Sequence, residues 1–110
     1  MYYIKKRLEV SGSHRLTLNH ESKCSRLHGH NWIIVVYCCA KQLDENGMVV
    51  DFSKIKEIIS LLDHADLNEV LPFNPTAENI AKWIVDVVPK CYRADVIESE
   101  GNEASYVLGE

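Results

Sequence analysis

One cysteine and three histidines lie close together near the start of the chain, with the spacing of a metal site that has a reactive group beside it. His28 and His30 flank Gly29, Cys24 precedes them, and His14 lies further upstream. Side chains two residues apart in an extended segment point to the same face, so we expect His28 and His30 to converge. If His14 ends a preceding antiparallel strand, that strand can bring it level with the pair.

A cluster of imidazoles indicates a particular class of ion. Neutral imidazoles suit a borderline-soft divalent metal, zinc first, and three protein ligands leave a fourth position open, as catalytic sites do. The sequence also allows a closed structural site with Cys24 as fourth ligand, or ordinary loop histidines without a metal. His20 has no patterned partner, and we expect it at the surface.

Further side chains could move protons. Cys24 lies between Lys23 and Arg26, and positive neighbours favour the thiolate, a candidate base or nucleophile. The alternative is a structural thiol, for which a polar loop is a poor place. Asp63 and His64 are adjacent, so they pair only in a turn, where His64 could shuttle a proton and Asp63 could fix its tautomer. The alternative is a histidine that stabilises a helix C-terminus.

Glu98 is a carboxylate near the end of the chain that follows the apolar residues Val96 and Ile97. A carboxylate on an apolar strand needs a partner. One candidate partner is a ligand with a flat donor edge, such as a pterin or guanine, bound by two hydrogen bonds. The alternative is an exposed glutamate on an edge strand.

The elements that must position these residues alternate in a simple order: strand, strand, helix, helix, strand, strand. Apolar periodicity predicts strands over about 2–10 (continuing to His14), 31–40, 94–99 and 104–108, and helices over about 51–62 and 76–88. Asp51 and Thr76 are the expected helix N-caps. The second strand is apolar in both parities, which predicts burial on both faces. The connections favour an α+β fold with an antiparallel sheet and both helices on one face.

Composition sets outer bounds on the function. A chain of 110 residues is one domain, residues 1–110, and 46% apolar and 25% charged residues are ordinary globular values. A net charge of −4 without a basic block argues against nucleic acid as a partner. No apolar run could span a bilayer and no signal-peptide pattern is present, so we expect a cytoplasmic protein whose cysteines stay reduced.

Several short motifs together are specific to one family. They are Ser13-His14-Arg15-Leu16, Cys24-x3-His28-Gly29-His30-Asn31, Gly47-Met48-Val49-Val50-Asp51-Phe52, Leu62-Asp63-His64, Leu67-Asn68, Asn74-Pro75-Thr76-Ala77-Glu78-Asn79, Trp83, Glu98-Ser99, Tyr106 and Gly109-Glu110. With these motifs the chain resembles the 6-pyruvoyltetrahydropterin synthase and 6-carboxytetrahydropterin synthase family over nearly its whole length.

The resemblance implies a fold and an assembly. The fold would be the tunnelling fold (T-fold), a four-stranded antiparallel sheet with two helices on one face in the order ββααββ. Subunits would join their sheets into a barrel, as a homohexamer of two stacked trimers with active sites between subunits.

The resemblance also implies roles for residues. Zn²⁺ would bind His14, His28 and His30. Cys24 would act as a base, and Asp63 and His64 would form a second proton-transfer pair from a neighbouring subunit. Glu98 would anchor the pterin and belong to the catalytic relay, and Thr76 would contact the pterin.

One spacing distinguishes two branches of this family. Three residues separate Cys24 from His28, as in the bacterial carboxy enzymes. The resemblance therefore implies a zinc-dependent lyase of queuosine biosynthesis that converts 7,8-dihydroneopterin triphosphate to 6-carboxy-5,6,7,8-tetrahydropterin, releasing acetaldehyde and triphosphate. The alternatives are the pyruvoyl reaction, which eliminates triphosphate without cutting the side chain, a non-catalytic zinc- or pterin-binding module, and a structural zinc protein.

Overall fold

The chain folds into one sheet with helices on a single face. The computed structural model describes residues 1–109, so Glu110 of the terminal motif lies outside the described residues. The elements are β1 (Tyr2–His14), the 3-10 helix η1 (Lys23–Ser25), β2 (His28–Ala40), α1 (Phe52–Ile59), the 3-10 helix η2 (Ser60–Leu62), β3 (Ala65–Asp66), α2 (Leu67–Val70), α3 (Ala77–Val87), β4 (Cys91–Ser99) and β5 (Asn102–Val107).

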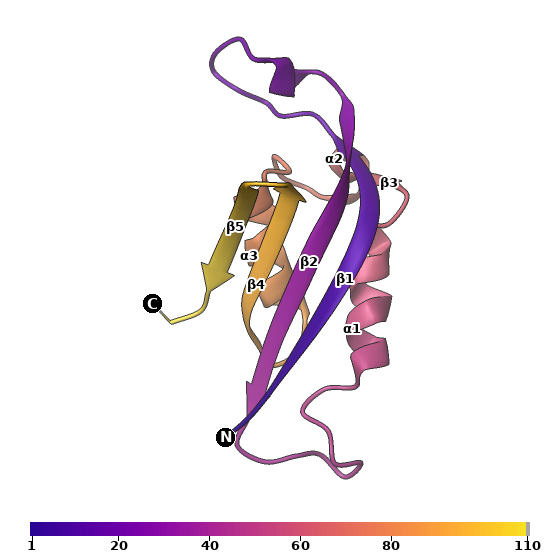
Figure 1. Ribbon diagram of the computed structural model, residues 1–110, viewed down its shortest axis with the longest axis vertical. Coiled ribbons are helices and arrows are strands. Elements are labelled where there is room, and N and C mark those ends of the chain that lie inside the picture. The colour runs from indigo at the N-terminus through magenta and orange to yellow at the C-terminus, as the bar shows by residue number, and fades with distance from the viewer. Residues whose placement is uncertain (110) are drawn as a thin grey trace.

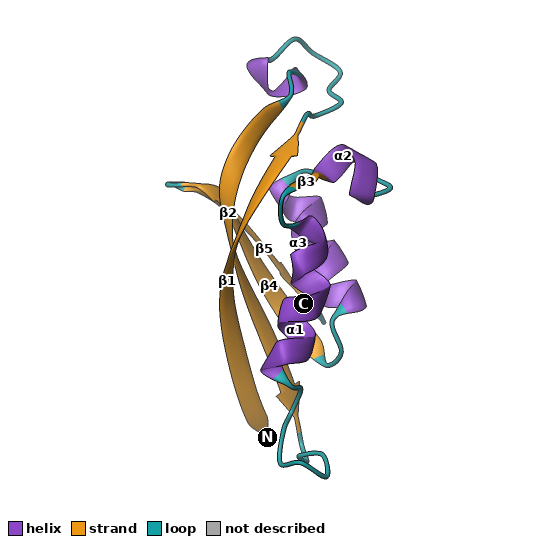
Figure 2. Ribbon diagram, turned by 90° about the vertical axis from the view of Figure 1, so that its right-hand side faces the viewer, coloured by secondary structure: helices purple, strands orange, loops and turns teal. Residues whose placement is uncertain are grey.

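The architecture has two layers. The strand order in the sheet is β3-β1-β2-β4-β5, and the helices pack on one side of it (Figures 1 and 2). The long strands β1 and β2 form a hairpin whose connecting loop projects beyond the rest of the sheet (Figure 1). No helix in residues 1–109 is long and apolar enough to cross a membrane. The predicted α+β class with helices on one face is confirmed.

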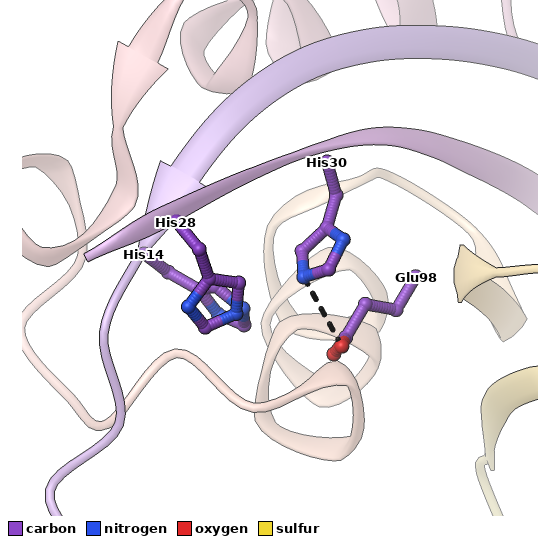
Figure 3. A group of neighbouring side chains, drawn as sticks. All are labelled: His14, His28, His30 and Glu98. Atoms are coloured by element: carbon purple, nitrogen blue, oxygen red, sulfur yellow. Dashed lines mark ion pairs between the residues drawn. The ribbon is translucent and has the colours of Figure 1, made fainter. Parts of the chain in front are cut away.

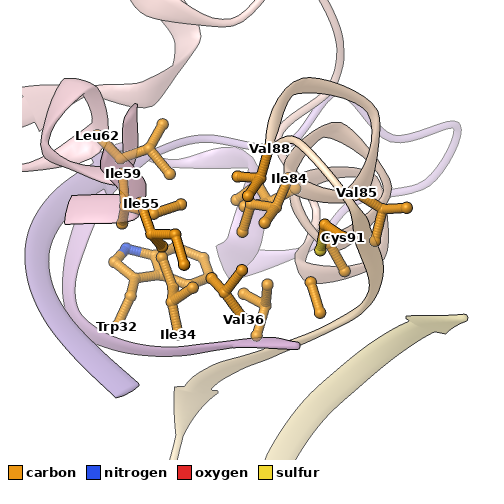
Figure 4. Close-up of a cluster of buried hydrophobic side chains, with 14 of the residues drawn as sticks. Trp32, Ile34, Val36, Ile55, Ile59, Leu62, Ile84, Val85, Val88 and Cys91 are labelled. Atoms are coloured by element: carbon orange, nitrogen blue, oxygen red, sulfur yellow. The ribbon is translucent and has the colours of Figure 1, made fainter. Parts of the chain in front are cut away.

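The core lies between the sheet and the helices α1 and α3. Alternate residues of β2, among them Trp32, Ile34 and Val36, point into it and are almost completely buried. They meet Ile55 and Ile59 of α1 and the buried face of α3 (Figure 4). Side chains on one face recur every two residues along a strand and about every 3.6 residues along an α-helix. Each element therefore presents one apolar face, and these faces pack together.

The predicted helix starts are confirmed, and each follows from a capping side chain. The Asp51 carboxylate accepts the backbone N–H of Ser53 at the start of α1. The Thr76 hydroxyl accepts the backbone N–H of Asn79 at the start of α3. Such caps satisfy N–H groups that have no partner within the helix.

The prediction of a four-stranded, purely antiparallel sheet is wrong. The sheet has five strands, because the two-residue β3 pairs in parallel with the end of β1. The pairing sets Gly12 opposite Ala65 and Ser13 opposite Asp66. The segment between the two predicted helices also contains the single-turn helix α2, capped by Asp66. Elements this short leave no periodic signal in the sequence.

The prediction that β2 is buried on both faces is confirmed only for the face that packs against the helices. Trp32 and Ile34 are buried beneath the helices, whereas Ile33, Val35 and Tyr37 on the opposite face are half-buried. No helix covers that second face within the described residues (Figure 2). Its apolar side chains therefore remain available for contact with another surface.

A buried carboxylate organises the open face of the sheet. Asp95 accepts hydrogen bonds from the Tyr37 hydroxyl at 2.6 Å, the Ser105 hydroxyl at 2.6 Å and the Arg93 Nε at 3.0 Å. Burial by itself raises the pKa of Asp95, but these hydrogen bonds outweigh it and hold the pKa below its usual value. The carboxylate therefore ties together β2, β4 and β5.

Replacing Asp95 by asparagine should destabilise the fold in a pH-dependent way. The change removes the charge on which three donors converge, so we expect a loss of about 1–3 kcal/mol at pH 7 in urea unfolding. Because the folded-state pKa is lowered, the stabilisation is present above the unfolded-state pKa of about 4 and disappears as the pH falls further. The difference between Asp95→Asn and the parent should therefore shrink in acid, whereas exposed Glu57→Gln should change little. A constant difference from pH 7 to below about pH 4 would contradict this account.

Candidate metal centre and active site

Three histidines converge where β1 ends and β2 begins. The antiparallel register sets His14 opposite His28 and Gly12 opposite His30. The ring centroids of His14, His28 and His30 lie 4.5 to 5.1 Å apart. Together with the Glu98 carboxylate, their ligand atoms all lie within 4.8 Å of one another (Figure 3). This is a possible His/Glu metal-binding group.

The hydrogen bonds of the rings leave the inward nitrogens free for a metal. Taking each Nδ1 as the protonated nitrogen, His14 donates to the Pro75 carbonyl at 2.8 Å and His28 to the Arg26 carbonyl at 2.6 Å. The Nε2 atoms of His14 and His30 are buried without a hydrogen-bond partner in the described chain. Metal-bound histidines typically donate their second nitrogen to a carbonyl in this way. The residues therefore fit a divalent ion that prefers imidazole.

Burial keeps two of these rings in the protonation state that a metal requires. Desolvation is the largest cause that lowers the pKa of His14, and it outweighs the opposing hydrogen bond to Pro75. Desolvation also lowers the pKa of His30, against the attraction of Glu98. Both rings are consequently held neutral near pH 7, and a neutral imidazole can donate its lone pair.

Glu98 lies beside the histidines and not on an exposed edge. Its strand β4 is flanked by β2 and β5, and its side chain is 24% exposed. One carboxylate oxygen lies 3.2 Å from His30 Nε2 (Figure 3). This contact is an ion pair only when His30 is protonated, and it does not have the geometry of a hydrogen bond. The carboxylate is therefore free to accept bonds from a ligand.

Cys24 lines the same cavity as this group but is not part of it. The cavity, of about 600 Å³, is lined by Cys24, Glu98, His28 and His30 among others. Ligand pockets of small molecules typically measure about 300–1,000 Å³. The close His/Glu group in residues 1–109 does not include the Cys24 sulfur, which favours an open three-histidine site over the closed alternative. All four cysteines are free thiols.

Asp63 and His64 do not meet Cys24 within one chain. They form the predicted turn, with His64 Nε2 3.7 Å from the Asp63 carboxylate, and the His64 side chain is 82% exposed. His64 has a φ of +53°, a left-handed backbone conformation that is unusual for a residue other than glycine. Backbone and side-chain bonds to Ser11 hold this turn on β1. His64 lines a second cavity, with Ser11, Ser13 and Asn31 from the open sheet face.

Two asparagines of the family motifs, to which the sequence analysis gave no role, hold the loop between β1 and β2. The Asn68 side chain accepts from the Arg15 N–H at 2.8 Å and donates to the Arg15 carbonyl at 2.9 Å. Asn74 makes the same paired contacts with Thr17, at 2.8 and 3.2 Å. Inside the loop, the Leu16 N–H donates to the Cys24 carbonyl at 2.9 Å.

These contacts place Cys24 relative to the histidines. Each asparagine side chain pairs with both the N–H and the carbonyl of one backbone residue, as a neighbouring strand would do. The first residues of the loop are therefore held in place. Asparagine in a proline-containing loop is usually a turn former, and for this reason only the family motifs could have pointed to these two residues. Thr76 uses its hydroxyl to cap α3, and its contact with a pterin stays a prediction.

The fold and the site together define an α+β protein with a possible metal centre where the first strand ends and the second begins. The 6-pyruvoyl tetrahydropterin synthase family model matches residues 3–108. The chain therefore belongs to the 6-pyruvoyl tetrahydropterin synthase family, and it is a tetrahydropterin synthase-like enzyme.

Individual relatives agree with this assignment. The chain is 36% identical over 121 residues to the 6-carboxy-5,6,7,8-tetrahydropterin synthase of Synechocystis sp., which covers 96% of this chain and 93% of the relative. It is 33% identical over 114 residues to the protein of the same name from Rickettsia bellii, covering 81% and 82% of the two chains. The solved structure of Caenorhabditis elegans 6-pyruvoyl tetrahydropterin synthase superposes with a TM-score of 0.75 at 25% identity, over 96% of this chain and 94% of the other.

Removing one histidine should weaken metal binding strongly. Loss of an outer-shell partner already costs 10- to 100-fold in metal affinity, so we expect His28→Ala to lower zinc affinity by more than about a hundredfold. Competition with a chromophoric chelator measures this, with circular dichroism to verify the fold. His20→Ala, outside the group, is the matched control. Zinc binding by His28→Ala at the parent's affinity would rule out the three-histidine site.

Removing the asparagine contacts should release the loop. In Asn74→Ala the Thr17 N–H loses its acceptor, so we expect its hydrogen exchange to accelerate about tenfold, the equivalent of one hydrogen bond. Asn68→Ala should do the same at Arg15, and Asn19→Ala, in the same loop, should leave both amides unchanged. Unchanged exchange at Thr17 in Asn74→Ala would show that the loop is held by other contacts.

Proposed function

We propose that the protein is a zinc-dependent lyase that converts 7,8-dihydroneopterin triphosphate and one water molecule to 6-carboxy-5,6,7,8-tetrahydropterin, with release of acetaldehyde and triphosphate, in queuosine biosynthesis. One observation carries the proposal: His28, His30, the free thiol of Cys24 and the Glu98 carboxylate line a single cavity, and the buried His14 completes the same group of candidate metal ligands. The relatives named 6-carboxy-5,6,7,8-tetrahydropterin synthase support the choice of reaction.

The side chains of the site differ in chemistry, and we assign each of them a role on that basis. His14, His28 and His30 would hold zinc, which as a Lewis acid would lower the pKa of the substrate side-chain hydroxyls. Glu98 would accept two hydrogen bonds from the flat donor edge of the pterin, because its oxygens are not occupied by other donors in the described chain. Cys24 would take and return protons on the substrate side chain. The ring is then reduced by tautomerisation, so no redox cofactor is required.

A second proton-transfer group must come from elsewhere. Within one chain His64 lines a different cavity from Cys24, on the other face of the sheet. We therefore assign Asp63 and His64 to the active site of a neighbouring subunit, and Thr76 to a contact with the pterin. The half-buried apolar side chains on the open sheet face support an assembly in which sheets join into a barrel, as a homohexamer of two trimers in the cytoplasm.

The products decide between the two branches of the family. We expect the zinc-loaded protein to convert dihydroneopterin triphosphate to 6-carboxytetrahydropterin and acetaldehyde, both detected by mass spectrometry. Exclusive formation of pyruvoyltetrahydropterin would assign the chain to the sister reaction. Binding of the pterin without any product would make it a non-catalytic pterin-binding module.

One substitution separates an enzyme from a structural zinc protein. Cys24→Ala removes the proposed base but no zinc ligand, so we expect retained zinc and an unchanged melting temperature. Turnover should fall by about 10²–10⁴-fold, the usual contribution of a positioned acid or base. Cys39→Ala, a half-buried thiol elsewhere on β2, is the matched control. Loss of zinc and unfolding in Cys24→Ala would instead establish Cys24 as a structural ligand.

A further inference from the structure

The charges around the site are divided between two adjoining cavities. Cys24, Glu98 and Asn102 line both of them. The cavity that includes His28 and His30 also carries Lys23 and Arg26. The other, of about 370 Å³, carries Glu78 and Glu103 besides Glu98. An anionic group is therefore attracted to the first cavity and repelled from the second.

We infer that Lys23 and Arg26 form a subsite for a linear polyphosphate ester, the triphosphate arm of the substrate. The identity of this arm rests on the proposed function. The subsite itself rests on two cations that share a cavity with the candidate metal ligands and have no carboxylate partner.

Neither cation is neutralised by the protein. The ion pairs in residues 1–109 involve His30, His64, Lys82 and Arg93, and neither Lys23 nor Arg26 takes part in one. Both side chains are exposed at the wall of the cavity, and both also line a neighbouring cavity in the loop, which includes Glu21. Glu98, the carboxylate that lines the cavity of His28 and His30, lies next to His30. The two cations are therefore available to an anionic ligand that enters this cavity.

Local contacts place these cations next to the metal site. The Arg26 carbonyl oxygen accepts a hydrogen bond from His28 Nδ1 at 2.6 Å, which links Arg26 directly to a candidate metal ligand. Lys23 and Arg26 border the short helix η1, whose N-terminus is capped by the Ser22 side chain. The Leu16 bond to Cys24 fixes the middle of this segment. A polyphosphate held here lies beside the side chain on which the metal and Cys24 act.

The two residue types suit the two parts of such a ligand. The planar guanidinium of arginine binds phosphate oxygens in pairs, whereas the lysine ammonium acts as a compact point charge. The acidic residues of the adjoining cavity set the opposite end of the ligand, where a ring with N–H donors meets Glu98. The charge division therefore gives the substrate one orientation across the cavity.

Binding of inorganic tripolyphosphate tests the subsite without catalysis. We expect calorimetry on the zinc-loaded protein to show binding that weakens about tenfold in Arg26→Gln and again in Lys23→Gln, as for loss of one charge-assisted contact each. Arg15→Gln is the matched control, since Arg15 lies at the start of the same loop but does not line this cavity. Zinc content is measured after each titration, because tripolyphosphate also chelates zinc.

Steady-state kinetics adds a readout that separates binding from an effect on Cys24. In both variants KM for the triphosphate substrate should rise about tenfold, while the affinity for 7,8-dihydroneopterin, which lacks the triphosphate, stays unchanged. If kcat and its pH profile move while tripolyphosphate binding does not, the cations act on the thiol and the subsite is refuted. Unchanged tripolyphosphate affinity in both variants also refutes it, even if the enzyme turns over as proposed. Conversely, weakened tripolyphosphate binding in a protein without turnover leaves the subsite standing and refutes the proposed function.

Discussion

The register between β1 and β2 is the constraint on which the candidate centre depends. His14 and His28 belong to strands that run in opposite directions, and they meet because the pairing sets them opposite each other. A shift of one residue would turn His28 and His30 to the open face of the sheet, where Ser11 and Asn31 now lie. The buried residues Trp32 and Ile34 resist such a shift, since the same slip would expose them to solvent. The hydrophobic core thus fixes the geometry of the metal ligands.

Two inward-facing nitrogens of the candidate centre have no hydrogen-bond partner in the described chain. A buried polar atom without a partner costs about 1–3 kcal/mol, and the inward nitrogens of His14 and His30 are two such atoms in the described chain. The Pro75 carbonyl and the packing around His14 hold the ring in this costly orientation. A divalent ion would satisfy both nitrogens. The loop held by Asn68 and Asn74 adds the free thiol of Cys24 to the lining of the cavity that contains His28 and His30.

The sequence was most informative where its signals are periodic or chemically rare. Alternation along β1 and the two-residue spacing of His28 and His30 were enough to predict that His14, His28 and His30 could converge, and the caps Asp51 and Thr76 marked the helix starts. The two-residue β3 and the single turn of α2 could not be predicted, because elements this short leave no periodic signal. The roles of Asn68 and Asn74 were hidden for a different reason: they bind backbone atoms that are more than fifty residues away in sequence. The position of His64, in a separate cavity from Cys24, also follows from tertiary structure alone.

X-ray absorption at the zinc edge tests the central claim most directly, namely that three histidines hold the metal and Cys24 stays free. For the zinc-loaded protein we expect imidazole nitrogens at about 2.0–2.1 Å, remaining ligands that are light atoms, and no sulfur in the first shell. The spectrum of Cys24→Ala should be the same. A sulfur ligand at about 2.3 Å in the parent that is absent from Cys24→Ala would contradict the account, because it would make the site a closed structural centre.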